Sequence, residues 1–261
     1  MGNRFVNNRW FTAARKPRLN DSALYCLAHA GGNAEDFLGW QSGLTDDITL
    51  KAVVLPGTGR RYDEAYQANI DTLTDNIAAA IEQEDDKQFY LFGHSMGAIL
   101  AWEVAKKMKK KSPNGLILSA CLSPPEIPSP RIKKMAVMSD DIFIKEMVYF
   151  NGLDENMIAN PFLNEIIAEK LKRDFKLIAG YRYQPTEAID APIMAIVGEN
   201  DAHVSADKMA QWQAHSKNFL GLKQVSGNHF YFNDNPSVIT NAINEMVHES
   251  RNKSSNYQVL I

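Results

Sequence analysis

Apolar residues along the chain gather in short runs that have the length of β-strands. Residues 23–28 are almost continuously apolar, which is typical of a strand covered on both faces in a parallel sheet. Residues 48–55 alternate and close at Pro56-Gly57, as a strand followed by a turn would. The same kind of pattern predicts further strands at residues 89–92, 116–122, 192–197 and 219–225.

The segments between these runs have the spacing or the composition of helices. Ile70, Leu73 and Ile77 recur at helical intervals, so they lie on one face of an amphipathic helix. Further helices are predicted around Phe37 and Trp40 and at residues 98–105, 205–215 and 236–248. This alternation predicts an α/β fold, a doubly wound and mostly parallel sheet with right-handed crossovers. Ligands bind such sheets at the carboxyl ends of the strands.

The alternation stops between Ser123 and Gln184. This stretch opens with prolines and continues with helical runs at residues 142–150 and 162–183, without a convincing strand. Long insertions in such sheets are usually functional, so we interpret residues 123–184 as a helical lid. No linker-like stretch divides the chain, and we expect residues 1–261 to form a single domain that carries this insertion.

Charge and cysteine content narrow the class of protein. A net charge of −3 over 261 residues gives no basic footprint for nucleic acid. No apolar stretch is long enough to span a membrane. Cys26 and Cys121 are too few for a disulfide framework, and we expect both to be buried and reduced. These features predict a cytoplasmic enzyme, which we expect to be a monomer.

The strand at residues 89–92 leads into Gly93-His94-Ser95-Met96-Gly97 and then into a predicted helix. A serine with glycines two positions away on either side, between a strand and a helix, is typical of a nucleophile elbow. The strained backbone presents the Ser95 hydroxyl to substrate, and at Gly93 and Gly97 strand and helix pass too close for a Cβ atom. A chance match in a loop is the alternative, but the flanking elements favour the elbow.

A serine hydroxyl needs a base beside it, and the base needs an acid that fixes its tautomer. In folds of this kind, the acid and then the histidine follow the serine on loops after later strands. His229 fits because it follows the final strand directly. His203 competes because it is close to Asp201 in sequence, although it would have to fold back over its own loop. We expect His215 and His248 to be exposed on helices.

Asp201 is the candidate acid because it lies just past the strand at residues 192–197. Glu199, on the same loop, is the alternative. Asp190 precedes that strand and therefore belongs to the opposite edge of the sheet. Asp234 follows the histidine in the chain.

The oxygen that becomes negative during attack by a serine needs two preorganised donors, usually backbone N–H groups. We expect one from Met96, the residue after the nucleophile. The other is expected from Ala30, where two following glycines let the backbone approach the substrate. The preceding His29 is interpreted as a residue that shapes the loop, and His94 as one that packs against neighbouring strands. This chemistry requires no metal and no bound cofactor.

Several motifs together are more specific than the elbow alone. They are His29-Ala30-Gly31-Gly32, Leu55-Pro56-Gly57, Gly93 to Gly97, Leu171 to Phe175 with Tyr181-Arg182-Tyr183, Gly198 with Asp201, and Gly227 to Phe230. With them the chain resembles the stand-alone type II thioesterases that accompany nonribosomal peptide and polyketide synthases, over most of its length. It departs from the family at Ala28, where proline is frequent, and at Thr58, where arginine is frequent.

The resemblance implies the α/β-hydrolase fold and a thioester hydrolase. Such an enzyme clears stalled or misprimed acyl or aminoacyl groups from the phosphopantetheine arm of an acyl or peptidyl carrier protein. The family's catalytic serine, aspartate and histidine carry over onto Ser95, Asp201 and His229. A small-molecule carboxylesterase or lipase of the same fold is the alternative, because fold and triad do not choose the acyl acceptor. A non-catalytic binding protein is a further alternative, which the apparently complete triad disfavours.

Overall fold

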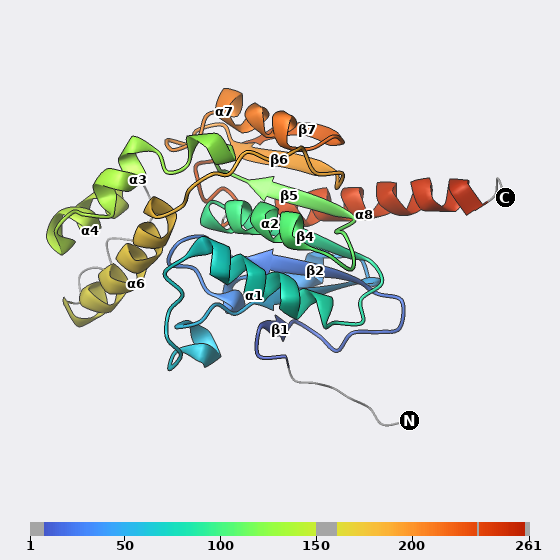
Figure 1. Ribbon diagram of the computed structural model, residues 1–261, viewed down its shortest axis with the longest axis horizontal. Coiled ribbons are helices and arrows are strands. Elements are labelled where there is room, and N and C mark those ends of the chain that lie inside the picture. Colours follow the sequence, from blue (N-terminus) through green and yellow to red (C-terminus); the bar gives the residue numbers. More distant parts are fainter. Residues whose placement is uncertain (1–7, 150–160, 234, 259–261) are drawn as a thin grey trace.

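The computed structural model describes residues 8–149, 161–233 and 235–258. Its centre is a seven-stranded sheet with the strand order β1-β3-β2-β4-β5-β6-β7 (Figure 1). All neighbouring strands are parallel except β1 and β3, which are antiparallel. The strands are β1 (Phe11–Ala13), β2 (Ser22–Leu27), β3 (Ile48–Val53), β4 (Phe89–His94), β5 (Gly115–Ser119), β6 (Ile193–Gly198) and β7 (Phe219–Val225). The prediction of a mostly parallel sheet is confirmed, and β1 is an addition to it.

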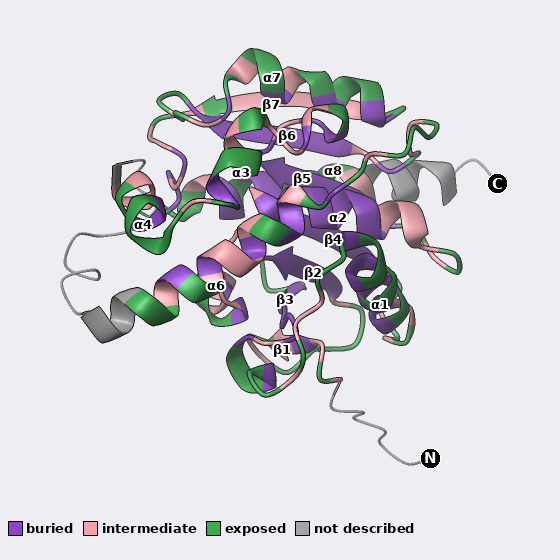
Figure 2. Cartoon of the chain, turned by 60° about the vertical axis from the view of Figure 1, so that its left-hand side comes forward, coloured by how far each residue is buried: buried purple, intermediate pink, exposed green. Residues whose placement is uncertain are grey.

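Helices cover both faces of this sheet, as a doubly wound fold requires. Alternate residues of β2 belong to different cores, because successive side chains of a strand point to opposite faces. Tyr25 and Leu27 pack in the core under α1 (Ile70–Glu82) and α2 (Met96–Lys107), whereas Leu24 and Cys26 pack in the other. The 3-10 helix η1 (Ala34–Gly43) and α8 (Ser237–Gln258) cover that second core. Figure 2 shows the sheet buried between these layers.

The order of the strands reverses beside β2. The chain runs from β2 outward to β3 and then crosses back to β4 on the other side, pairing Leu27 with Gly93. Such a switch point opens a crevice at the carboxyl ends of the two strands, which is where ligands bind in open α/β sheets. The residues that follow these ends are His29 after β2 and Ser95 after β4.

The described part of residues 123–184 contains helices and no strand. The short η3 (Pro124–Glu126) and α3 (Pro130–Met135) precede α4 (Asp140–Tyr149) and α6 (Pro161–Ala179). Helices α3 and α4 both contact α6 and share a small apolar core with it, including Phe143. In Figure 1 these helices lie beyond the arrowheads of β2 and β5, at the carboxyl end of the sheet. Residue 150 of the predicted run 142–150 lies outside the described residues.

Two predicted helices differ from the structure. The predicted helix 205–215 is divided into α7 (Ala206–Ala210) and the 3-10 helix η4 (Gln211–His215). Helix α8 begins as predicted but continues to Gln258 instead of ending near 248. Its extension has a tertiary cause, since Arg251 pairs with Asp47 and donates to Ser22 Oγ at the start of β2. The remaining short element is η2 (Gly59–Arg61).

Both cysteines are buried and unpaired, as predicted. Burial raises the pKa of the Cys121 thiol to about 12, so it remains protonated near neutral pH. Among the helices of the described residues, none combines the length and the apolarity needed to cross a bilayer.

Candidate active site

The turn between β4 and α2 has the geometry of a nucleophile elbow. Ser95 has φ 53° and ψ −116°, a conformation that is strained for a residue with a side chain. Its N–H donates to Ser119 O of the adjacent strand at 2.8 Å, which holds the turn in this conformation. An added Cβ on Gly93 would lie 2.1 Å from Gly97 O, and one on Gly97 would lie 2.0 Å from Leu27 O. Strand and helix therefore meet at Gly93 as predicted, while Gly97 faces the neighbouring strand β2.

The structure brings His229 and Asp201 together at the ends of β7 and β6. His229 Nδ1 lies 2.8 Å from Asp201 Oδ2, and the Asp201 side chain is fully buried. The other carboxylate oxygen accepts the N–H groups of His203 at 2.7 Å and Val204 at 3.1 Å. Burial acts to raise the pKa of Asp201, but His229 and these two donors outweigh it and hold the pKa below its ordinary value. The ionised carboxylate thus fixes the orientation of the imidazole.

The two loops meet because Gly198 permits a close crossing. A Cβ on Gly198 would lie 2.3 Å from Asn228 O, so no larger residue fits at the end of β6. Backbone hydrogen bonds continue from the strands into the loops, with the Asn200 N–H donating to Gly227 O at 2.9 Å. Residues on either side of this crossing, Asp201 and His229, are thereby held at hydrogen-bonding distance.

Two of the alternative acids, Glu199 and Asp190, lie at exposed positions. Asp190 is paired with Lys217 at 2.9 Å. Asp234 lies outside the described residues. Of the carboxylates considered from the sequence, Asp201 is the one that the structure pairs with His229.

The competing histidine, His203, lies beside the pair, with its ring centroid 4.6 Å from that of His229. Its backbone supports Asp201, whereas the Asp201 contact to an imidazole goes to His229. His248 is exposed, as predicted. The prediction for His215 is wrong, since it is buried with its ring centroid 5.4 Å from that of Trp102. The chain changes from α7 to the 3-10 helix η4 before His215. The spacing of a single α-helix therefore does not predict which way this side chain faces.

Four predicted site residues line one cavity of about 440 Å³ at the carboxyl ends of the strands. They are Ser95, His229, Ala30 and Met96. The rest of this cavity, which we call the Ser95 cavity, is lined largely by apolar side chains. Ile99, Ile127 and Ile132 belong to it, as do Met135, Phe175 and Ile178 of the helical segment.

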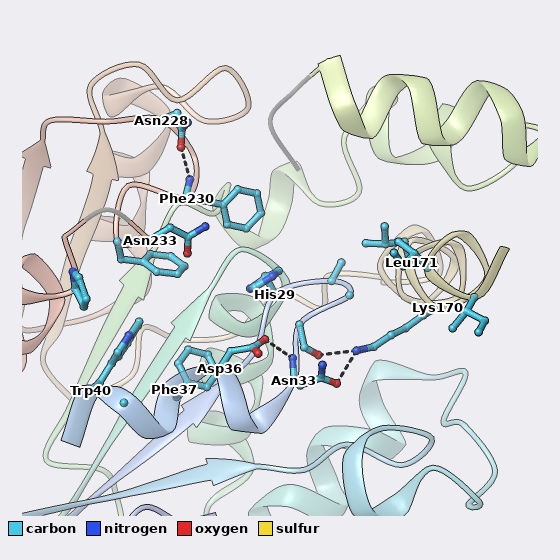
Figure 3. Close-up of a pocket in the computed structure, with 18 residues that line it drawn as sticks. His29, Asn33, Asp36, Phe37, Trp40, Lys170, Leu171, Asn228, Phe230 and Asn233 are labelled. Atoms are coloured by element: carbon cyan, nitrogen blue, oxygen red, sulfur yellow. Dashed lines mark hydrogen bonds between the residues drawn. The ribbon is translucent and has the colours of Figure 1, made fainter. Parts of the chain in front are cut away.

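A second opening of about 1100 Å³, drawn in Figure 3, shares the loop after β2 with the Ser95 cavity. We call it the Lys170 cleft, and it is bordered by η1, α6 and the loop after β7. His29 and Phe230 line both openings, with their ring centroids 5.0 Å apart. Burial, with the nearby charges of His229 and Lys170, lowers the pKa of His29 to about 4. His29 is therefore neutral near pH 7.

His94 packs among rings as predicted, but it also belongs to a polar network that the sequence did not indicate. Its Nδ1 lies 2.8 Å from Ser119 Oγ, which lies 2.7 Å from the Tyr231 hydroxyl. Burial lowers the pKa of His94 well below its ordinary value, so it is neutral here. Since Ser119 O also holds the Ser95 N–H, the network joins the elbow to the loop that carries His229. Among the described residues, no group of three or more His, Cys, Asp or Glu could hold a metal ion.

A strained serine at the switch point of a mostly parallel sheet, with a paired histidine and aspartate on the loops after β7 and β6, defines an α/β hydrolase. The model of the thioesterase domain family matches residues 22–249. The chain therefore belongs to the thioesterase family, and it is a serine hydrolase that acts on thioesters.

Individual relatives agree with this assignment. The chain is 30% identical over 228 residues to thioesterase PikA5 of Streptomyces venezuelae, with 85% of this chain and 79% of the relative covered. It is 28% identical to the gramicidin S biosynthesis protein GrsT of Aneurinibacillus migulanus, with 86% and 88% covered. Among solved structures, the type II thioesterase BorB from the borrelidin biosynthetic cluster matches with a TM-score of 0.82 and 27% identity, over 91% of this chain and 97% of that one.

Proposed function

We propose that this thioesterase removes stalled or misprimed acyl and aminoacyl groups from the phosphopantetheine arms of carrier proteins in nonribosomal peptide or polyketide biosynthesis. The observation that carries the proposal is the strained Ser95 and the Asp201-bound His229 on the wall of one cavity. Similarity to type II thioesterases supports the choice of carrier-bound substrates.

Catalysis runs through an acyl-enzyme on Ser95. The Ser95 hydroxyl attacks the thioester carbonyl while His229 takes its proton, and Asp201 stabilises the resulting imidazolium. The tetrahedral intermediate collapses, the carbon–sulfur bond breaks, and His229 gives the proton to the pantetheine thiol. A water molecule, deprotonated by His229, then attacks the acyl-enzyme and releases the carboxylic acid and free Ser95.

The negative oxygen of both intermediates is held by the backbone N–H groups of Ala30 and Met96. Met96 is the first residue of α2, where the dipole of the helix also favours negative charge. Ala30 lies opposite it on the loop after β2, and both line the Ser95 cavity. Donors of this kind contribute roughly 10²–10³-fold to the rate each.

Residues 123–184 act as a lid whose apolar side chains receive the acyl group. Phe175 and Ile178 of α6 and Met135 of α3 support this role, because they line the Ser95 cavity above the serine. The lid packs on the sheet as part of one domain that comprises residues 1–261. The partner is an acyl or peptidyl carrier protein, and the reaction takes place in the cytoplasm, where Cys26 and Cys121 remain reduced.

The experiment that tests this function measures acyl release from a loaded carrier domain. The wild-type enzyme is expected to hydrolyse the carrier-bound thioester faster than an oxygen ester of the same acid. Ser95→Ala should lose at least about 10³-fold in rate, because the acyl-enzyme cannot form. Ser42→Ala, at an exposed position of η1, is the matched control and should keep the wild-type rate.

Two outcomes would contradict the proposal. Faster hydrolysis of the oxygen ester than of the carrier-bound thioester would favour a small-molecule carboxylesterase. Equal rates for Ser95→Ala and the wild-type enzyme would remove Ser95 from the reaction altogether.

A further inference from the structure

The loop that carries Ala30 is a tight turn of a kind that has two common forms, which differ in the orientation of the central peptide. The Gly32 N–H donates to His29 O at 3.0 Å, which closes a turn with Ala30 and Gly31 at its centre. Gly31 has φ 80°, the value required at the third position of a type II turn. In the related type I turn, the peptide between the two central residues is rotated, so a contact to that peptide favours one form over the other.

That contact comes from Asp174 on α6. Its Oδ2 accepts the Gly31 N–H at 2.7 Å, which belongs to the central peptide of the turn. Gly31 and Asp174 are 143 positions apart in the chain, and Asp174 is 2% exposed. A hydrogen bond from a backbone N–H to a buried carboxylate is about twice as strong as one between neutral groups. The carboxylate therefore selects the form of the turn that the structure has.

Neighbouring residues of α6 hold the same turn from the same side. Lys170 donates to Gly32 O at 3.3 Å and to Asn33 Oδ1 at 2.7 Å, and Figure 3 shows it reaching from α6 to this loop. Leu171 packs so closely that a Cβ on Gly31 would lie 2.4 Å from its Cδ2 atom. Residues 170–174 of the helix thus contact the backbone of Gly31 and Gly32 and the side chain of Asn33.

Asp174 is itself fixed by a second loop of the sheet. The Tyr66 hydroxyl donates to its other oxygen, Oδ1, at 2.8 Å. The guanidinium of Arg173 lies over the Tyr66 ring at 4.3 Å and donates to Gly57 O at 3.3 Å. Both oxygens of the buried carboxylate are therefore occupied, and its position is set from two sides.

We propose that Asp174 is a positioning residue for the reaction, which fixes the turn that carries the oxyanion donor Ala30 by holding the adjacent Gly31 peptide. The proposal rests on the function proposed above. Asp174 touches neither the substrate nor Ser95, and it acts through the turn. Because Phe175 and Ile178 of the same helix line the Ser95 cavity, α6 connects the wall of the acyl site to the oxyanion loop.

The test separates stabilisation of the oxyanion from binding. Asp174→Ala is expected to lower kcat by roughly 100-fold, the effect of a displacement of about 1 Å at a catalytic group. KM should change by less than about threefold, since the oxyanion donor stabilises the transition state and not the bound substrate. Asp174→Asn keeps one neutral acceptor of the same shape and should lose roughly tenfold. Glu169→Ala, at an exposed position on the same helix, is the matched control and should keep the wild-type kcat.

The affinities for two ligands distinguish a positioning role of Asp174 from a merely structural one. An alkyl trifluoromethyl ketone adds to a serine hydroxyl and forms an oxyanion, whereas an alkyl thioether of N-acetylcysteamine binds without reacting. In Asp174→Ala the affinity for the ketone should fall by the same factor as kcat/KM, and the affinity for the thioether should stay within about threefold. If the alanine variant does not fold, the affinities for the ketone and the thioether are compared in Asp174→Asn instead.

Equal losses for both ligands, or no loss for either, would overturn the proposal. The outcome is independent of the proposed function, because the ketone adduct on Ser95 can be measured whichever thioester is the substrate. A wild-type enzyme that forms the adduct but leaves carrier-bound thioesters intact would refute the function alone. Loss of carrier hydrolysis in Ser95→Ala, with an unchanged Asp174→Ala, would refute the role of Asp174 alone.

Discussion

At the residue scale, the site depends on titratable groups that their surroundings keep in one protonation state. Asp201 is held ionised by His229 and two N–H groups, while His29 and His94 are held neutral by burial. The imidazoles of His29, His94 and His229 can consequently lie close together without repulsion between positive charges. The ring centroids of His94 and His229 are 4.8 Å apart. Protonation of either buried histidine would oppose the protonation of His229 that the proposed mechanism requires.

The lowered pKa of His29 predicts a dependence of stability on pH. His29 binds a proton below its ordinary value of 6.5 when unfolded, but only below about 4 when folded. Between these values the unfolded state binds more protons, so the free energy of unfolding falls as the pH drops from 6.5 towards about 4. His29→Gln removes this contribution and should make the decline shallower in urea unfolding measured across that window.

The matched control for this measurement is His248→Gln, at an exposed position on α8. It should reproduce the wild-type dependence of stability on pH. A wild-type slope in His29→Gln would show that burial of His29 carries no such penalty.

Sequence patterns located the residues of the elbow and its partners, because each lies next to a strand end or a glycine. The sequence shows Asp174 only as part of a motif, since its partner Gly31 is distant in sequence and no spacing indicates a contact between them. The helical pattern predicts an exposed His215 because it does not reveal the change to η4. In both cases tertiary contacts decide what the side chain does.

At the scale of elements, two sets of contacts attach the helical segment to the rest of the fold, one in the second half of α6 and one just beyond its end. Asp174 and Lys170 hold the loop that carries Ala30. Beyond the end of the helix, the hydroxyl of the buried Tyr181 donates to Glu103 Oε1 of α2 at 2.6 Å. Burial, reinforced by the charge of Glu103, raises the pKa of Tyr181, which therefore remains a hydrogen-bond donor.

Removal of this hydroxyl should destabilise the fold. Tyr181→Phe leaves the buried Glu103 carboxylate with fewer donors, although Lys106 still contacts it at 3.1 Å. We expect the free energy of unfolding to fall by about 1 to 3 kcal/mol, measured by chemical denaturation. Tyr62→Phe removes the same atom at a position that is 80% exposed, and it should have almost no effect. A Tyr181→Phe protein as stable as the wild type would mean that the hydrogen bond from Tyr181 to Glu103 makes no net contribution to the free energy of unfolding.

The elements that the sequence did not predict are those that only the fold stabilises. Strand β1 has three residues, too few for an alternating pattern, and it exists because Phe11 to Ala13 pair with residues 51–53 of β3. The last turns of α8 are polar, and Arg251 anchors them at the start of β2. Long apolar runs, by contrast, were sufficient to predict the six other strands.

At the scale of the whole molecule, the alternation of strands and helices predicted the layers of the fold but not the order of the strands. The order matters because it opens the crevice between β2 and β4, where Ala30 and Ser95 face one cavity. Loops after β6 and β7 bring Asp201 and His229 to the same end. The carboxyl ends of the parallel strands β2, β4, β6 and β7 thus bring four distant loops to one site. Helix α6 adds a fifth segment.

The central claim is that Ser95 carries the acyl group during hydrolysis of a carrier-bound thioester. The most direct measurement mixes the enzyme with an acylated carrier domain, quenches the reaction in acid within the first turnover, and maps the acyl group by peptide mass spectrometry. We predict an added acyl mass on the peptide that contains Ser95, which disappears as the free acid forms and is absent from Ser95→Ala. Release of the acid by an enzyme that never carries the acyl group on Ser95, or that carries it on another residue, would contradict the account.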